Sequence, residues 1–200
     1  MNLPNKLTVS RFGLTALFLW ALFWPMQLPL RFTLALFFFC LAGVTDFLDG
    51  KIARDRGLIT NFGILMDPLA DKILVCSAFI AFIQITHAKP EAPVRVAAWV
   101  VILIVARELA ITGLRLLAAS KNLVLAAENF GKHKTISQIV TIIALLVVDA
   151  APEWPTPLEK VFQSWMPTFA AIMLWVTVVL TAVSGMLYLW RNRSLYMSDV

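Results

Sequence analysis

The chain has 200 residues, of which 60% are hydrophobic and only 14% are charged, and its mean hydropathy is +0.81. A water-soluble domain is closer to half apolar, so this composition argues against an ordinary soluble fold and predicts one integral membrane domain over residues 1–200. The net charge of +5 suits anionic lipid headgroups, because the basic residues lie between apolar stretches, and we expect no nucleic-acid partner.

Six apolar stretches, separated by short polar connections, approach the length of about 20 residues that a helix needs to cross a bilayer. In chain order, the predicted membrane helices cover about residues 9–25, 31–55, 61–86, 94–119, 134–150 and 160–190. Proline-containing segments separate the third helix from the fourth and the fifth from the sixth. The sequence therefore predicts an all-α integral membrane protein with six transmembrane helices.

The distribution of basic residues predicts the orientation of these helices. Six crossings put both termini on one side of the membrane. Of the 17 Lys and Arg residues, all but Arg31, Lys89, Arg95 and Lys160 belong to that side, and the asymmetry persists without Lys72, Arg107 and Arg115, which count less because they lie inside spans. Because basic residues favour the cytoplasmic side, both termini are predicted to face the cytoplasm from the cytoplasmic (inner) membrane.

Four aspartates recur at helical spacing around the connection between the second and third predicted helices. Asp46 and Asp49 are three residues apart, and Asp67 and Asp71 are four apart, so each pair shares a helix face. We expect the two helices to be antiparallel neighbours whose cytoplasmic ends gather the four carboxylates. Such charges repel strongly in a low-dielectric place unless cations neutralise them. Oxygen ligands without His or thiolate favour Mg²⁺ or Mn²⁺, and four carboxylates suffice for two ions.

Small residues and one arginine accompany the aspartates. Gly50 and Ala53 continue the face of the second helix that carries its acids, and they leave room for a flat ligand. Arg54 offers a planar fork for phosphate at the same end. By physical reasoning alone, these residues fit a phosphoryl-transfer enzyme, and a cation transporter or cation-binding protein stays open. Arg54 argues against the transporter, because a fixed cation hinders the passage of cations.

The stretch D-x2-D-G-x2-A-R-x8-G-x3-D-x3-D, from Asp46 to Asp71, matches the signature of the CDP-alcohol phosphotransferase family at every specified position. The chain resembles this six-helix membrane family over its whole length. The resemblance implies that the four aspartates hold two Mg²⁺ ions and that Asp71 is the base that takes the proton of an acceptor hydroxyl. It also implies a homodimer, release of CMP, and a CDP pocket lined by Gly50, Ala53 and Arg54.

Two polar residues precede the first apolar run. Asn5 and Thr8 are one helical turn apart, which places them to reach the nucleotide, and a role as an N-terminal cap is the alternative.

A second group of charges lies in and after the fourth predicted helix. Arg107 and Arg115 are eight residues apart and share a helix face, while Lys132 and Lys134 precede the fifth helix. Cations near a helix N-terminus suit an anion such as phosphate, so these four residues predict a phosphorylated acceptor, with cytoplasmic anchoring as the alternative for the two lysines. Adjacent helical residues point apart, so we expect no ion pair between Arg107 and Glu108.

Three shorter segments, NLPNKLTVSRF, ARELAITGLR and GKHKT, resemble the branch of the family that uses glycerol 3-phosphate. This resemblance implies transfer of the phosphatidyl group from CDP-diacylglycerol to glycerol 3-phosphate, which gives phosphatidylglycerophosphate and CMP. Cardiolipin synthases of the same family, which use phosphatidylglycerol, share parts of these segments. Phosphatidylglycerol, inositol phosphate and other alcohols therefore stay open as acceptors.

Overall fold

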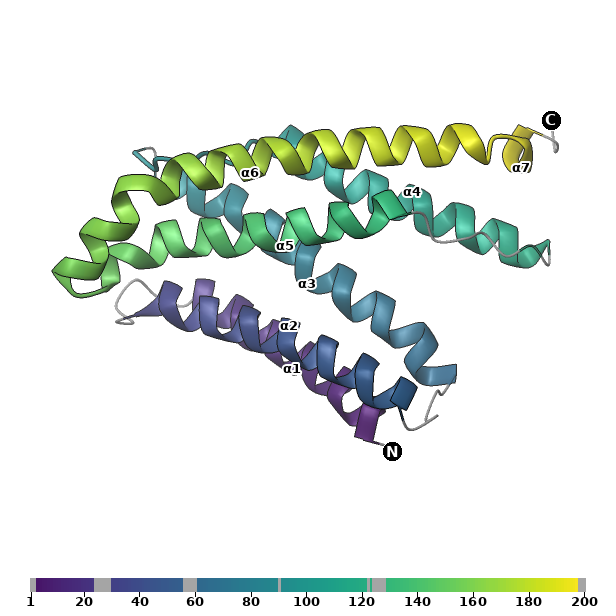
Figure 1. The fold of residues 1–200 in the computed structure, drawn as a ribbon, viewed down its shortest axis with the longest axis horizontal. Helices are drawn as coiled ribbons and strands as arrows, with labels where there is room; N and C mark the ends of the chain where they lie inside the picture. Colours follow the sequence, from purple (N-terminus) through teal and green to yellow (C-terminus); the bar gives the residue numbers. More distant parts are fainter. Residues whose placement is uncertain are drawn as a thin grey trace.

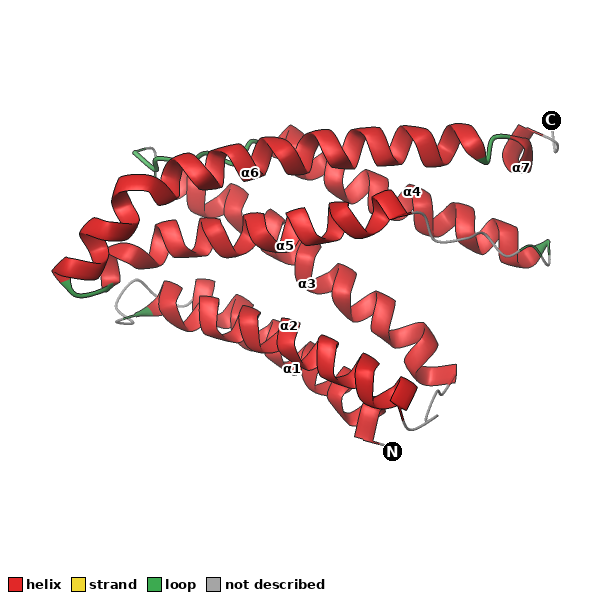
Figure 2. Ribbon diagram, viewed as in Figure 1, coloured by secondary structure: helices red, strands yellow, loops and turns green. Residues whose placement is uncertain are grey.

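The computed structural model describes residues 3–23, 30–55, 61–89, 91–121, 123 and 129–197, with side chains except those of residues 3–7, 47, 49–55, 61–65, 129–132 and 194. These residues form helices joined by short connections, without a strand among them (Figure 2). The helices are α1 (Leu3–Phe23), α2 (Arg31–Asp55), α3 (Asn61–Ala88), α4 (Ala98–Ser120), α5 (Asn129–Ala150), the 3₁₀ turn η1 (Ala151–Glu153), α6 (Thr156–Arg191) and α7 (Ser194–Met197).

The six long helices lie where the apolar stretches predict them. The bounds of α2 are those expected, and the other helices begin and end within a few residues of their predicted limits. The largest differences are at the starts of α1, at Leu3, and of α5, at Asn129, because the polar segments that precede both apolar runs are already helical. Helix boundaries depend on the capping and packing of the end turns, which apolar periodicity does not encode.

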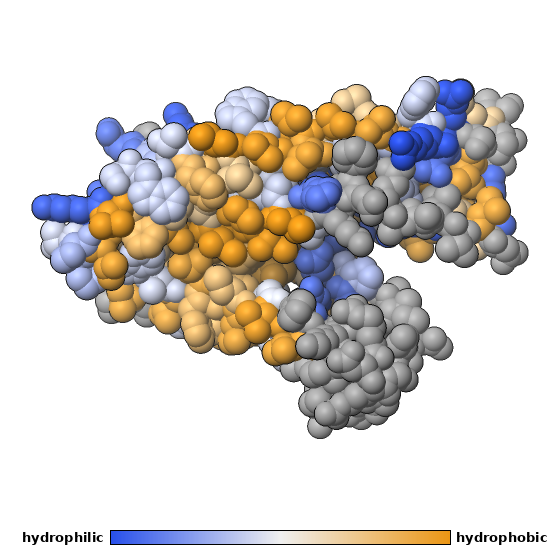
Figure 3. Space-filling view, viewed as in Figure 1, coloured by the Kyte–Doolittle hydropathy of each residue, from blue (hydrophilic) through white to orange (hydrophobic). Residues whose placement is uncertain are grey.

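Three helical segments of the described chain are long and apolar enough to cross a membrane: Met66–Ala88, His133–Glu153 and Thr156–Arg191. Residues Thr8–Phe23 form a shorter apolar segment. In the view of Figure 3, apolar side chains cover the middle of the molecule, and hydrophilic ones gather toward its left and upper right ends. An apolar belt between polar ends is the surface that a bilayer requires, so the protein is membrane-integral.

The helices pack as two pairs with α3 between them. α1 lies along α2 and α5 lies along α6, and the two pairs diverge toward the right of Figure 1. α3 contacts α1, α4 and α5, but among the described residues it touches α2 only slightly. The second and third helices contact each other, as expected, but only slightly among the described residues, and α1 contacts both of them.

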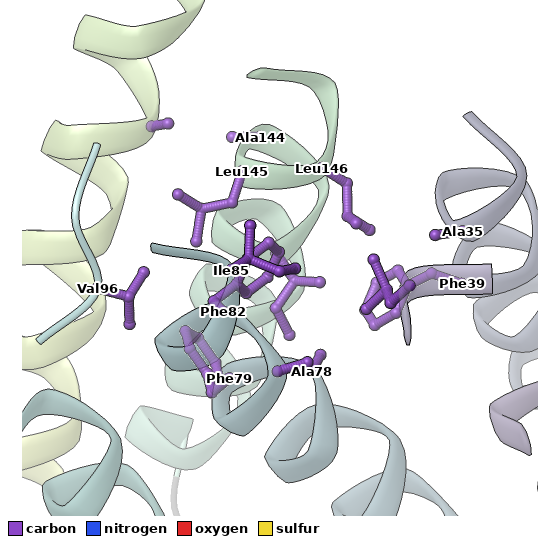
Figure 4. Packing of buried hydrophobic residues seen from close by; sticks show 14 of the residues in the cluster. Ala35, Phe39, Ala78, Phe79, Phe82, Ile85, Val96, Ala144, Leu145 and Leu146 are labelled. Atoms are coloured by element: carbon purple, nitrogen blue, oxygen red, sulfur yellow. The ribbon is translucent and has the colours of Figure 1, made fainter. Parts of the chain in front are cut away.

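Apolar side chains from α2, α3 and α5 meet in one core. Figure 4 shows Phe39 of α2, Phe79 and Phe82 of α3, and Leu145 and Leu146 of α5 converging there, and all five are buried. Aromatic rings bury large apolar areas, so these residues fix the position of α3 between the two helix pairs.

Hydrogen bonds join the start of α2 to the α5–α6 connection. We call this end of the bundle the far end. The carboxylate of Glu153, in η1, accepts hydrogen bonds of 2.9 Å from the backbone N–H groups of Phe32 and Thr33 and one of 2.8 Å from the Thr33 hydroxyl. Trp154 Nε1 also donates to Thr33 Oγ1 over 2.9 Å. Because the first N–H groups of a helix lack intrahelical acceptors, the carboxylate caps α2 and fastens it to the α5–α6 connection.

We predict that Glu153→Gln lowers stability by about 1–2 kcal/mol, the usual value of a helix cap, because an amide is a weaker acceptor than a carboxylate at a positive helix end. The melting temperature of the purified protein in detergent should fall by about 3–6 °C. Glu159→Gln is the matched control, since Glu159 only accepts an exposed 3.0 Å bond from Gln163. Equal melting temperatures for the two variants would contradict the role of Glu153 as a cap.

Candidate active site

The described acidic residues of the predicted signature lie at the other end of the bundle, which we call the site end, and α1 joins them. Arg11 Nη1 of α1 lies 2.6 Å from Asp46 Oδ1 of α2 and donates a long 3.5 Å hydrogen bond to the carbonyl of Asp67 in α3. Thr8, one turn earlier, donates to Asp67 Oδ1 over 2.6 Å. Two residues of one helix face thus link two of the predicted ligands.

The third described aspartate, Asp71, is placed between acidic and basic neighbours. It follows Asp67 by one turn of α3 and lies within electrostatic range of Asp46 and Arg11. It also lies within range of Lys134 of α5 and Glu108 of α4. Asp71 therefore lies between the aspartates of α2 and α3 on one side and the charged residues of α4 and α5 on the other.

Several residues predicted for the site fall outside the described side chains. They are Asn5, Asp49, Gly50, Ala53, Arg54 and Lys132. Their backbones belong to α1, α2 and α5; those of α2 were expected on the second helix, whereas Asn5 and Lys132 were expected just before the first and fifth helices. Their assignments to metal, CDP and acceptor phosphate stay predictions.

The residues that are described fit the proposed divalent ions by their charge. Asp46, Asp67 and Asp71 offer only oxygen ligands, and the guanidinium of Arg11 is the cation in contact with Asp46. One positive charge leaves an excess of negative charge among the carboxylates, which hard divalent cations would remove. Within the described part of the chain, no group of three or more His, Cys, Asp and Glu residues lies close enough to hold a metal. The predicted ligand set includes Asp49, outside that part.

A buried charge cluster joins α4 and α5 beside Asp71. Lys134, of which only 3% is exposed, pairs with the carboxylate of Glu108, which is 8% exposed. Arg107 Nη1 lies 3.2 Å from the same carboxylate oxygen. The expectation that Arg107 and Glu108 do not pair is therefore wrong: although adjacent side chains leave a helix in different directions, both are long enough to converge beside Lys134.

The two arginines of α4 share a face, as predicted, and that face contacts α6. Arg107 Nη2 donates to Ser184 Oγ over 3.4 Å, and Arg115 Nε donates to Tyr188 Oη over 3.3 Å. The stem of Arg107 lies against Gly185, where an added Cβ would come within 2.9 Å of Arg107 Cγ. The structure thus brings Arg107 and Lys134 together through Glu108, while Arg115 lies two turns away and is exposed.

Sequence reasoning missed two residues of the site. Arg11 was counted only as a basic residue of the cytoplasmic side, although its side chain is 1% exposed. Its spacing of three from Thr8 placed both on one face of a helix, and this signal could have grouped them. Glu108 was noted only as a neighbour of Arg107, yet an acid inside an apolar stretch usually has a function and a partner.

Comparison with known proteins agrees with this chemistry. The profile of the CDP-alcohol phosphatidyltransferase family matches residues 1–183. The chain is 39% identical over 201 residues to the CDP-diacylglycerol–glycerol-3-phosphate 3-phosphatidyltransferase of Bacillus subtilis, covering 96% of this chain and 95% of the relative. Proteins of the same name from Rickettsia bellii and Haemophilus influenzae are 32% and 30% identical, with 94% of this chain covered in each case and 93% and 91% of the relatives.

The match extends over nearly all of the six long helices, and the relatives align over more than nine-tenths of their own length. It includes the aspartates of α2 and α3 as well as the charged cluster of α4 and α5. The chain therefore belongs to the CDP-alcohol phosphatidyltransferase family.

Proposed function

We propose that this protein transfers the phosphatidyl group from CDP-diacylglycerol to glycerol 3-phosphate, which yields phosphatidylglycerophosphate and CMP in phospholipid biosynthesis. The observation that carries the proposal is that two groups of opposite charge lie near each other. Asp71 lies within electrostatic range of Lys134, which Glu108 joins to Arg107. Carboxylates suit a metal-bound pyrophosphate, and cations beside them suit an acceptor that carries its own phosphate.

The residues of this chain have complementary roles in the reaction. A hydroxyl of glycerol 3-phosphate attacks the phosphorus that bears the diacylglycerol, and its proton passes to the Asp71 carboxylate. The bond from this phosphorus to the bridging oxygen breaks, and CMP leaves with the electron pair. Arg107, Arg115, Lys132 and Lys134 bind the phosphate of the acceptor and orient its hydroxyl.

Asp46, Asp49, Asp67 and Asp71 would hold two divalent ions, Mg²⁺ or Mn²⁺. When bound, these ions supply positive charge that neutralises the pyrophosphate and stabilises the departing CMP. Gly50, Ala53 and Arg54 line the CDP pocket, and Asn5 contributes from α1. Thr8 is better assigned to the support of Asp67, to which it donates over 2.6 Å, than to the nucleotide.

The membrane arrangement that we propose has all six long helices crossing the bilayer and both termini in the cytoplasm. The distribution of Lys and Arg supports the orientation, and the first and last helices begin and end toward the right of Figure 1. An active site at the cytoplasmic face of the inner membrane lets a lipid-tailed donor meet a soluble acceptor. We further propose a homodimer, for which the apolar groove of about 530 Å³ between α3 and α4 offers a surface.

The purified protein, given CDP-diacylglycerol, Mg²⁺ and glycerol 3-phosphate, should release CMP, and omission of the acceptor or chelation of the metal should stop the release. Asp71→Asn should lower turnover by about 10²–10⁴-fold, the usual contribution of a general base, and by more if Asp71 also binds metal. Glu159→Gln, an exposed change, is the control for turnover, and melting temperature is the control for folding.

Absence of CMP from the unmodified protein under these conditions would refute the proposed function. Release with phosphatidylglycerol or inositol phosphate, but not with glycerol 3-phosphate, would reassign the acceptor. Ion flux through proteoliposomes without any nucleotide chemistry would favour a cation transporter. Retained turnover in Asp71→Asn would refute the assignment of the base alone.

Removal of a cation from the α4–α5 cluster should weaken acceptor binding. We expect Lys134→Gln and, separately, Arg115→Gln to raise the KM for glycerol 3-phosphate about tenfold, because each loses a charge-assisted contact worth about 1.5–3 kcal/mol. The KM for CDP-diacylglycerol should change much less. Lys134→Gln also leaves Glu108 with fewer partners, so the double variant with Glu108→Gln should regain melting temperature without regaining acceptor affinity. An equal rise in both KM values would contradict the assignment.

The position of Arg107 can be changed without altering its charge. Gly185→Ala puts a methyl group within 2.9 Å of Arg107 Cγ, so the arginine must move, and we expect a rise of roughly tenfold in the KM for glycerol 3-phosphate. Gly113→Ala in α4 is the matched control, because a Cβ there meets nothing within 4 Å. Steady-state kinetics of both variants with each substrate measure the effect. A similar KM in both variants would show that Arg107 does not bind the acceptor.

A further inference from the structure

Arg11 has an unusual position for a basic residue of a membrane helix. Its side chain is 1% exposed, and its Nη1 lies 2.6 Å from Asp46 Oδ1 and 3.5 Å from the carbonyl oxygen of Asp67. One guanidinium therefore joins α1 to both acidic helices. A residue that only anchored the protein to lipid headgroups would extend toward the membrane surface, as long basic side chains do.

The partner of Arg11 is a residue to which the proposed function gives a metal ion. Asp46, whose Oδ1 lies 2.6 Å from Arg11, is also one of the carboxylates to which the proposed function assigns the divalent ions. Two cations beside the same carboxylate repel each other, and the Arg11 side chain, only 1% exposed, has little water around it to screen the repulsion. Full contact with Arg11 and full ligation of a metal ion therefore compete for Asp46.

A second contact of α1 with the acidic helices involves neither Arg11 nor Asp46, and so it does not depend on this competition. Thr8 holds Asp67 by a neutral hydroxyl, and α1 packs along α2 over most of its length. Loss of the Arg11 contact would therefore leave α1 attached to both neighbours. The guanidinium can separate from Asp46 without detachment of its helix.

We propose that Arg11 is an exchangeable counter-cation: it neutralises Asp46 and positions Asp46 and Asp67 while no divalent ion is bound, and it gives up the carboxylate when the ions bind. This inference rests on the proposed function, which supplies the ions. It makes Arg11 a positioning residue for the metal ligands. It also ties the free energy of metal binding to the loss of one ion pair between a buried guanidinium and a half-exposed carboxylate.

The test is direct binding of Mn²⁺ to the detergent-purified protein, measured from the electron paramagnetic resonance signal of free Mn²⁺. Arg11→Gln removes the competing charge and should bind Mn²⁺ at least about fivefold more tightly than the unmodified protein, the lower range of typical coupling between two sites. Its melting temperature in chelator should fall, and Mn²⁺ should raise that temperature more than it does for the unmodified protein.

Two further variants separate this effect from a general loss of stability. Arg11→Lys keeps the positive charge, so its Mn²⁺ affinity should stay within about twofold of the unmodified protein. Lys89→Gln breaks a different ion pair, in which Nζ of Lys89, the residue after α3, lies 3.1 Å from Oδ1 of Asp149 in α5. This variant should melt at a lower temperature with unchanged Mn²⁺ affinity, because the pair lies at the far end.

Equal or weaker Mn²⁺ binding by Arg11→Gln would overturn the inference, and so would tighter binding by Lys89→Gln to the same extent. If Arg11→Gln does not fold without metal, Arg11→Lys decides: affinity close to that of the unmodified protein supports the inference, and affinity more than about fivefold tighter overturns it. If the unmodified protein binds no Mn²⁺, the proposed two-ion function fails and this inference fails with it. Binding that is insensitive to Arg11 refutes the inference alone.

Discussion

Carboxylates at the end of an apolar helix bundle repel one another, and positive charge must lie among them if the helices are to stay together. In this protein α1 supplies that charge. Arg11 is buried between α2 and α3, and Thr8 adds a hydrogen bond to the same acidic group. Because α2 and α3 touch each other only slightly, α1 is the element that determines how far apart their acidic faces lie. The arrangement of the active site thus depends on a helix that lies outside the family's aspartate signature.

The same balance of charge recurs on the opposite side of Asp71. Glu108 lies between Lys134 and Arg107, so two cations are held beside each other at a place where they would otherwise repel. The three side chains carry one net positive charge, and Gly185 and Ser184 of α6 fix the position of Arg107. A phosphate that approached this cluster would find cations already oriented, which lowers the entropic cost of binding.

The sequence predicted the helices well, since the period and length of apolar stretches determine them locally; the bounds of α2 are an example. It also identified Asp46, Asp67 and Asp71, because acids inside apolar sequence are costly and therefore informative. It did not predict that α1 contacts both α2 and α3, because amphipathic patterns do not specify which helices pack together. Arg11 was missed for this reason: its partners belong to other helices. Helix geometry alone argued against a pair between Arg107 and Glu108, but the Glu108 carboxylate is the shared partner of Arg107 and Lys134.

The cap that Glu153 places on α2 has a mechanical consequence for the distant carboxylates. Thr33 donates to the Glu153 carboxylate near one end of α2, and Asp46 lies thirteen residues further along, about 20 Å away at the rise of an α-helix. Over this length, a tilt of α2 by about 5° at Thr33 displaces the Asp46 carboxylate by almost 2 Å. The position of a carboxylate at the site end of the bundle is therefore set in part by a glutamate at the far end.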